Sequence, residues 1–487
     1  MQEKVLYFYL SSKRPPRSRK KDDMTFDSIS FLAFLSITWS GYWLLHKNCR
    51  AQNALLLLAS YIFYACWDAR FCLLLALCSL ISFAAGHLLA SAKKLPRRIY
   101  LFTSITILIS ILALFKYYNF FIASTISLLH ALGFNAHLPL LKLILPIGLS
   151  FYTFQSIGYI LDVSRGTIPP CRNALAFFTY MSFFPQLMAG PIARASEQLP
   201  QFLQPRHFTY DQGVDGCRQF LWGLFKKTIA DSCAIAATQT LDGTTDPKGI
   251  FIFSGLIIYT IQIYCDFSGY SDMALGIGKL FGIRLPRNFA FPYFATNIAD
   301  FWRRWHMSLM RWFKDYLYIP LGGSRVGKLR HIRNVFIVFL VSGLWHGAAW
   351  TFILWGLFHA CCFLPRFFFP KKTTSKPAAL FSWALTILAV MFGWLIFRAP
   401  NLTTLSTWLA SFTHFGTLHD LAHTGIATAI LPGLLVIAAE WFTRQKEHAL
   451  QSLPFPIFFR WTLYFTLIIL TLYWMPPSSG DFIYGQF

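Results

Sequence analysis

A succession of apolar segments along the chain restricts the folds that it can adopt. A helix needs about 20 predominantly apolar residues to cross the hydrocarbon core of a bilayer. Hydrophobic residues make up 55% of the 487 and charged residues only 13%, too few to coat a soluble surface of that size. We expect an all-α polytopic membrane protein with roughly ten to twelve full crossings, because some segments are short or interrupted by glycine. The segments are 27–46, 52–66, 71–91, 99–115, 117–134, 143–162, 217–236, 248–265, 267–283, 333–352, 353–369, 379–397, 425–442 and 459–475.

The net charge of +23 would suggest a nucleic-acid partner in a soluble chain. Here the basic residues gather in short loops between apolar segments, as "KNCR" at 47–50, "KKLPRR" at 93–98 and "RVGKLRHIR" at 325–333. This is the positive-inside pattern, so these loops should face the cytoplasm and membrane lipids replace nucleic acid as the expected partner. We predict a multi-pass protein of the inner (cytoplasmic) membrane.

The amino-terminal arm, residues 1–23, conflicts with that topology. Its basic run "SSKRPPRSRKKDD" at 11–23 would lie on the opposite side of the first span from "KNCR". Either the arm is a true extension, or the natural start is Met24, which leads directly into the first span; we favour Met24. Residues 24–487 are then expected to form one membrane domain with its core at about 145–365.

No spacing of residues in the sequence is typical of a metal site. None of the ten cysteines belongs to a CxxC pair, so we expect small buried thiols rather than disulfides or thiolate ligands. There is no HExxH motif. On a continuous helix His359 would lie about 20 Å from His346, which would prevent the two from sharing a metal.

Two carboxylates interrupt the apolar stretch "YTIQIYCDFSGYSDMALGIGKLFG" at 259–282. A carboxylate at membrane depth is costly and is rarely turned toward lipid, so Asp266 and Asp272 should face a polar cavity or a partner. Asp266 could cap a helix that begins near Gly269 after a break. It could also line a substrate tunnel, and the two interpretations are compatible because irregular backbone is tolerated where it lines a cavity.

The stretch "NIADFWRRWHMSLMRWFKDYLYIPLGG" at 297–323 has an aromatic face and a basic face when it is drawn as one helix. Such a helix is too charged to span and suits the membrane interface. His306, at the edge of the aromatic face, could be a structural hydrogen-bonding residue or could point into the protein. The cations could anchor on anionic headgroups or attract a phosphate-bearing acyl donor. The aromatic face comprises Phe301, Trp302, Trp305, His306, Leu309, Trp312, Phe313 and Tyr316, and the basic face Arg303, Arg304, Arg311 and Lys314.

A single histidine, His346, lies within the apolar sequence "LVSGLWHGAAW" at 340–350. Burial favours a neutral imidazole, which can accept a proton as a general base must. On a continuous helix Ser342 and Trp350 would share its face, and Gly343 and Gly347 would allow a backbone or ligand to approach. Spacing alone leaves both a catalytic and a merely structural histidine open.

Longer motifs carry a family resemblance. The run from "YCDFSGYSDMALG" through "FWRRWHMSLMRWFKDYLYIPLGGSR" to "GLWHGAAW" resembles the membrane-bound O-acyltransferase family. The resemblance is strongest to its bacterial branch of alginate O-acetylation and teichoic acid D-alanyl transfer proteins. Further matches are "LPIGLSFYTFQSIGYILDVSRG" at 145–166, "FFPQLMAGPIARASEQLPQF" at 183–202 and "GLFKKTIADS" at 223–232. It covers most of residues 24–475.

The resemblance implies acyl transfer through a central tunnel surrounded by spanning, re-entrant and interfacial helices. The family's near-invariant histidine corresponds to His346, and the second histidine of the bacterial branch to His306. No cofactor is implied beyond an acyl thioester donor, which we expect to be acetyl-CoA or another acyl thioester. The expected tunnel residues are Asp266, Ser268, Tyr270, Ser342 and Trp345, and the expected donor-binding residues are Arg303, Arg304 and Arg311.

The same resemblance implies acetylation of an extracytoplasmic polysaccharide of the alginate type, with a periplasmic acetyltransferase as an expected partner. D-alanyl transfer to a cell-wall polymer is the alternative within the family. A transporter or a scaffold subunit of polysaccharide export would be a different class, and would not require "FWRRWH" and "GLWHG" together. The acceptor polymer itself is not encoded in any motif.

Overall fold

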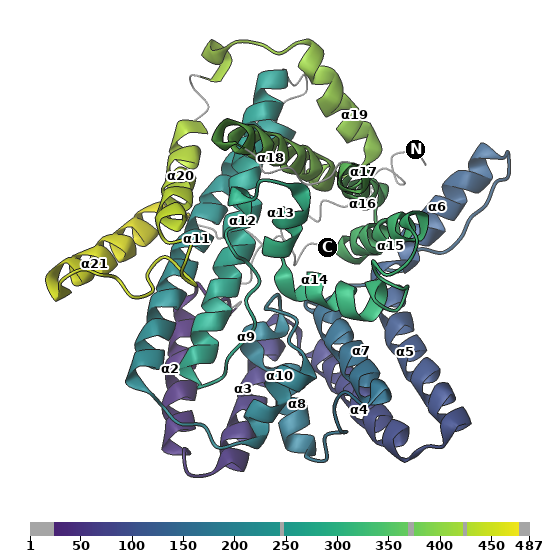
Figure 1. Ribbon diagram of the computed structural model, residues 1–487, viewed down its shortest axis with the longest axis vertical. Coiled ribbons are helices and arrows are strands. Elements are labelled where there is room, and N and C mark those ends of the chain that lie inside the picture. Colours follow the sequence, from purple (N-terminus) through teal and green to yellow (C-terminus); the bar gives the residue numbers. More distant parts are fainter. Residues whose placement is uncertain (1–23, 244–247, 369–374, 422–425, 477–487) are drawn as a thin grey trace. The chain divides into compact units, whose positions relative to one another are not determined.

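A computed structural model describes residues 24–243, 248–368, 375–421 and 426–476 (Figure 1). Over these ranges the chain is helical and contains no β-strand, which confirms the all-α prediction. The basic arm and the start-site hypothesis fall on residues 1–23, outside the described residues.

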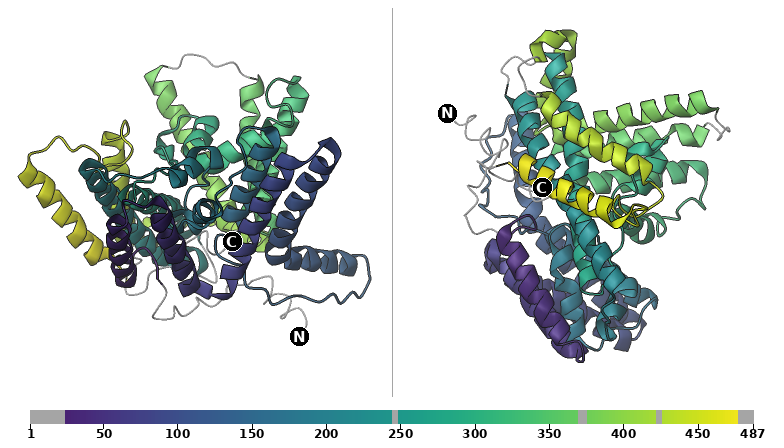
Figure 2. Two further views of the ribbon diagram at one scale, coloured as in Figure 1. Left: turned by 90° about the horizontal axis from the view of Figure 1, so that it is seen from below. Right: turned by 90° about the vertical axis from the view of Figure 1, so that its left-hand side faces the viewer.

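The described chain divides into two compact units. The first in sequence comprises residues 22–213 together with 278–286. Its strongest helix contacts join elements distant in the sequence, namely α4 with α7, α3 with α8 and α5 with α7. The sequence neighbours α4 and α5 also pack together, and the left view of Figure 2 shows them from below. The helices are α2 (Ile29–Leu44), α3 (Cys49–Asp68), α4 (Arg70–Ser91), α5 (Lys94–Lys116), α6 (Tyr118–Ala131), α7 (Leu149–Arg165), α8 (Ala174–Ser182), α9 (Phe184–Leu187) and α10 (Ala195–Leu203).

Within this unit, polar side chains bind the backbone that returns after α12. Tyr42 donates a hydrogen bond to the carbonyl of Phe281 at 2.8 Å, and Trp43 to that of Leu280 at 3.0 Å. The buried Arg206 donates to Asn53 at 2.8 Å. These bonds supply partners for polar groups that are removed from solvent.

The second unit comprises the described residues of 214–277 and 287–476 and contains the histidines of interest. Short one-turn elements separate some of its helices: η1 (Pro292–Phe294), the π-helical turn η2 (Lys314–Tyr318), η3 (Ser411–Thr413) and η4 (Leu418–Leu421). Its helices, two of which begin or end in the other unit, are α11 (Tyr210–Asp242), α12 (Gly249–Leu280), α13 (Ile298–Arg304), α14 (Met307–Phe313), α15 (Lys328–His346), α16 (Trp350–Phe363), α17 (Pro365–Phe368), α18 (Lys376–Arg398), α19 (Leu402–Ala410), α20 (Ile426–Phe442) and α21 (Ile457–Trp474).

Helices α11 and α12 lie side by side because glycines bring their backbones together (Figure 1). A Cβ at Gly223 would lie 2.6 Å from the carbonyl oxygen of Gly269, and a Cβ at Gly269 would lie 2.7 Å from that of Gly223. Small residues at helix contacts are typical of membrane bundles, where packing replaces the hydrophobic effect.

Six helices in the described part of the chain are long and apolar enough to cross a membrane by length and composition. They are α4, α5, α12, α18, α21 and the stretch Trp350–Phe368, and two shorter apolar helices are Ile29–Leu44 and Ala429–Phe442. The expected number of roughly ten to twelve crossings stays a prediction, because several further apolar helices are shorter or more charged than a typical span.

Three details of the expected helices are wrong. Segments 248–265 and 267–283 are one continuous helix, α12, so no break precedes Gly269 and Asp266 caps no helix. Segment 297–323 is not one helix, because α13 ends at Arg304 and α14 begins at Met307. Segment 333–352 is interrupted after His346, where Gly347 adopts an extended conformation with φ −165° and ψ 159°.

Candidate active site

His346 is the last residue of α15 and lies at the connected end of a helical hairpin with α16, beside the turn 347–349. The hairpin is tight because Gly343 lies against the carbonyl of Phe352 and Gly356 against that of Phe339. Any side chain at either glycine would collide with backbone atoms that cannot move aside. The expected close approach at Gly343 is thus confirmed, and the approaching backbone is that of α16.

The break after His346 overturns two expectations that assumed a continuous helix. Trp350 does not share a face with His346, because it begins α16 and is 54% exposed. His359 is not about 20 Å away along one helix, because α16 turns back along α15. Both imidazoles contact the ring of Trp355, with centroid distances of 5.0 Å for His346 and 4.9 Å for His359. Even so, no group of three His, Cys, Asp or Glu residues in the described ranges could hold a metal ion.

His306 forms the turn between α13 and α14 and has a left-handed backbone, with φ 46° and ψ 51°. A left-handed non-glycine residue is uncommon and persists only where the surrounding structure holds it. The turn directs the imidazole inward, since His306 is only 1% exposed. Its ring contacts Phe267 of α12 at 4.7 Å and Trp345 of α15 at 5.8 Å between centroids.

Trp345 is the residue that brings the two histidines together. Its indole contacts the imidazole of His306 at 5.8 Å and that of His346 at 5.0 Å between centroids. His346 is 3% exposed and Trp345 is 4% exposed, so this group is removed from solvent. Two imidazoles far apart in the sequence therefore border one indole, as a shared active site requires.

Aromatic rings enclose both histidines. His346 also contacts Phe397 of α18 at 5.4 Å, and Trp355 stacks parallel to Trp394 at 6.5 Å. Trp305, beside His306 in the turn, packs against Trp394 at 4.8 Å. The apolar surroundings penalise a charged imidazole, and burial lowers the pKa of His306 to about 3. His306 is therefore neutral at physiological pH and can both accept and donate a hydrogen bond.

The expected tunnel residues on α12 are buried inside the helix bundle. Asp266 accepts a hydrogen bond from Lys227 of α11 at 2.8 Å, and the same ammonium group binds Asp231 at 2.7 Å. Ser268 and Tyr270 are 1% and 6% exposed, and Ser342 on α15 is 3% exposed. Lys227 is thus the cationic partner that a carboxylate at this depth needs. The role of Asp266 in lining a tunnel stays a prediction.

A second buried cluster surrounds Asp272. Lys226 of α11 lies 2.5 Å from Asp272 and 3.4 Å from Glu440 of α20, and Tyr264 donates a hydrogen bond to Glu440 at 2.6 Å. Reasoning from the sequence did not identify either lysine or Glu440 as a partner of these groups. A usable signal existed: two buried carboxylates require cations, and "KK" lies within the apolar segment 217–236.

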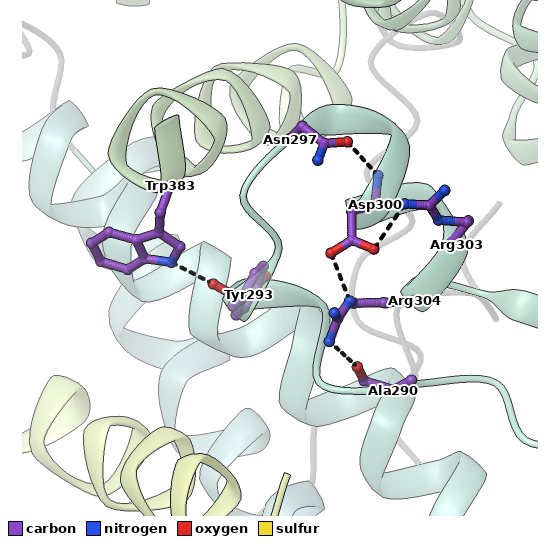
Figure 3. A network of polar contacts seen from close by, with 7 residues as sticks. All are labelled: Ala290, Tyr293, Asn297, Asp300, Arg303, Arg304 and Trp383. Atoms are coloured by element: carbon purple, nitrogen blue, oxygen red, sulfur yellow. Dashed lines mark hydrogen bonds and ion pairs between the residues drawn. The ribbon is translucent and has the colours of Figure 1, made fainter. Parts of the chain in front are cut away.

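The three expected donor-binding arginines differ in their surroundings. Figure 3 shows Asp300 of α13 between Arg303, at 3.1 Å, and Arg304, at 2.9 Å. Arg304 also donates to the carbonyl of Ala290 at 3.5 Å, so it braces the chain locally. The side chain of Arg303 is 59% exposed, and Arg311 is exposed as well. Arg303 and Arg311 thus have exposed side chains, while that of Arg304 is less exposed at 38% and binds both Asp300 and Ala290.

The family model "MBOAT, membrane-bound O-acyltransferase family" matches residues 171–408, a range that contains both histidines and both lysines. A curated relative named "Probable alginate O-acetylase AlgI", from Pseudomonas putida, is 40% identical over 417 residues, 85% of this chain and 84% of the relative. The chain belongs to the membrane-bound O-acyltransferase family. It is accordingly a multi-pass membrane protein and an acyltransferase, as the motifs predicted.

The names of two further curated relatives indicate different acceptor polymers. "Peptidoglycan O-acetyltransferase" of Helicobacter pylori is 38% identical over 405 residues, 76% of each chain. "Teichoic acid D-alanyltransferase" of Bacillus subtilis is 28% identical over 281 residues, 54% of this chain and 70% of the relative. For this member of the O-acyltransferase family, the comparisons favour acetyl over D-alanyl transfer, while the roles of individual residues have to be argued from the site.

Proposed function

We propose that this acyltransferase moves acetyl groups from a cytoplasmic thioester, acetyl-CoA, toward an extracytoplasmic polysaccharide of the alginate type. The contact of His306 and His346 with the single indole of Trp345 supports a shared catalytic site. The names of the relatives reported above supply the acetyl group and the alginate-type acceptor, and the thioester donor is the one that the family resemblance implies. The inner membrane is the location in which a cytoplasmic donor and an outer acceptor can both be reached.

In the proposed reaction His346 is the general base. Its neutral imidazole takes the proton from the acceptor hydroxyl as the hydroxyl oxygen attacks the thioester carbonyl carbon. The C–S bond then breaks, and the thiolate takes the proton back from the imidazolium to leave as CoA thiol. His306 either accepts a hydrogen bond that orients the acceptor hydroxyl or donates one to the carbonyl oxygen, where a donor fixed in a dry site stabilises developing negative charge most effectively.

The remaining groups are assigned to binding and positioning. Arg303 and Arg311 are exposed cations that suit the phosphates of the donor. Asp266, Ser268, Tyr270, Ser342 and Trp345 would line the path of the acyl group. A periplasmic acetyltransferase is the proposed partner, which would receive the acetyl group and pass it to the polymer.

Labelled acetyl-CoA supplied to the cytoplasmic face of membrane vesicles tests the proposal. Label should reach envelope glycan or an added partner in wild-type vesicles, and should stop in His346→Ala vesicles at matched expression. His137→Ala is the matched control, because His137 is exposed. Wild-type transfer by His346→Ala would end the proposal. If no label passes from acetyl-CoA but label passes from a labelled D-alanyl carrier supplied in its place, D-alanyl transfer would replace acetyl transfer.

A further inference from the structure

The left-handed turn at His306 is held by a short segment that no motif singled out. Residues Asn288–Ala290, here called the strap, run between α12 and η1 in the same unit as His306. The backbone N–H of Ala290 donates to the carbonyl of Arg304 at 3.0 Å, just before the turn. The backbone N–H of Met307 donates to the carbonyl of Asn288 at 2.9 Å, just after it. The strap therefore pins the chain on both sides of His306.

The side chain of Asn288 adds a third attachment. Its Oδ1 accepts a hydrogen bond from the Ser308 hydroxyl at 2.6 Å, and Asn288 is 0% exposed. The first turn of α14 has no side-chain cap from His306, so a bond at Ser308 fixes a helix start that would otherwise fray. A buried bond of this kind is costly to break, because the remaining group loses its partner away from water.

The middle residue of the strap supports the ring of the histidine indirectly. Phe289 contacts Trp305 at 5.1 Å and Phe267 at 4.9 Å, and Phe267 contacts the His306 imidazole at 4.7 Å. These edge-to-face contacts restrict the rotation of the imidazole. The strap thus controls both the backbone and the ring of His306.

We propose that Asn288 is a positioning residue for acyl transfer: through Ser308 and the Met307 amide it holds His306 in the left-handed turn that places the imidazole against Trp345, beside His346. This inference rests on the proposed catalytic role of the two histidines. Asn288 itself does not touch substrate. Its effect is on geometry, and a displacement of about 1 Å at a catalytic group can cost up to about a hundredfold in rate.

The substitutions Ser308→Thr and Ser308→Val give a matched pair. Threonine and valine have the same shape, and only threonine keeps the hydroxyl that bonds Asn288. In purified protein, Ser308→Val should have a kcat at least about tenfold below that of Ser308→Thr, with KM for acetyl-CoA and melting temperature similar in the two. Asn288→Ala should lower kcat comparably, and adding it to Ser308→Val should cost little more, because both remove one bond.

Equal kcat values for Ser308→Val and Ser308→Thr would overturn the proposal. So would a fully additive loss in the double variant, since the two residues would then act separately. The variants His346→Ala and His306→Ala, measured in the same assay, distinguish this result from a failure of the proposed function. If both histidine variants are inactive while the Ser308 pair is equal, only the strap proposal fails. If His346→Ala turns over at the wild-type rate, the proposed function fails.

Discussion

Lys226 should be far more important for stability than its place in an apolar helix suggests. Its ammonium group lies between Asp272 and Glu440, and the side chains of Lys226 and Glu440 are 2% and 3% exposed. Lys226→Met leaves two carboxylates close together without their cation. Removing one partner of a buried ion pair costs about 3–5 kcal/mol, because the remaining charge is uncompensated.

Glu440→Gln is the informative comparison. It leaves the Lys226–Asp272 pair intact, and the amide can still accept a hydrogen bond from Tyr264. We expect a loss of only about 1 kcal/mol, the typical value for weakening one hydrogen bond. Lys248→Met is a surface control, because Lys248 pairs with Asp420 at 2.7 Å but its side chain is 48% exposed. It should change stability little.

Thermal unfolding of the detergent-solubilised protein, followed by the fraction that stays monodisperse after heating, measures the three variants side by side. Lys226→Met should melt several degrees below both others or fail to accumulate. A Lys226→Met protein as stable as Glu440→Gln would refute the argument that this lysine compensates the buried carboxylates.

Two further predictions concern the hairpin and the charge state of the site. Gly343→Ala should lower both melting temperature and acyl transfer, because its methyl group would collide with the backbone of Phe352. Gly327→Ala should lower neither, because the space around its Cβ position is open. Equal melting temperatures and transfer rates for the two variants would contradict the packing argument. Burial lowers the pKa of His306 to about 3, so below pH 6.5 the unfolded chain binds a proton that the folded protein does not, and stability falls by about 1.4 kcal/mol per pH unit. His306→Gln should therefore lose less melting temperature than wild type between pH 7.5 and 5.5, and an equal loss would mean that His306 is not buried as a neutral group.

Long-range regularities of the sequence predicted much of this molecule. Apolar segments of spanning length marked most helices, and the motifs around His306 and His346 indicated the family and the two histidines. The expected division of 297–323 into an aromatic and a basic face also agrees with the structure at several positions. Phe301, Leu309 and Phe313 are buried, while Arg303 and Arg311 are exposed. These features follow from composition and periodicity, which act over many residues.

The sequence did not reveal the local events that assemble the site. The break at Gly347 and the left-handed turn at His306 occur within segments whose hydrophobic pattern continues through them, so periodicity could not detect them. The pairings of Lys226 and Lys227 with carboxylates on other helices are tertiary contacts between distant parts of the chain. A requirement that every buried carboxylate have a cation would have indicated both lysines from the sequence alone.

The central claim is that His306 and His346 serve one reaction, and a double-mutant cycle on acetyl transfer tests it most directly. Rates of label transfer from acetyl-CoA are measured for wild type, His306→Ala, His346→Ala and the double variant at matched expression. Residues that act as a unit are strongly non-additive. We predict that each single variant loses at least about a hundredfold and that the double variant is no slower than His346→Ala. Wild-type transfer by His346→Ala, or losses that multiply in the double variant, would contradict a shared active site.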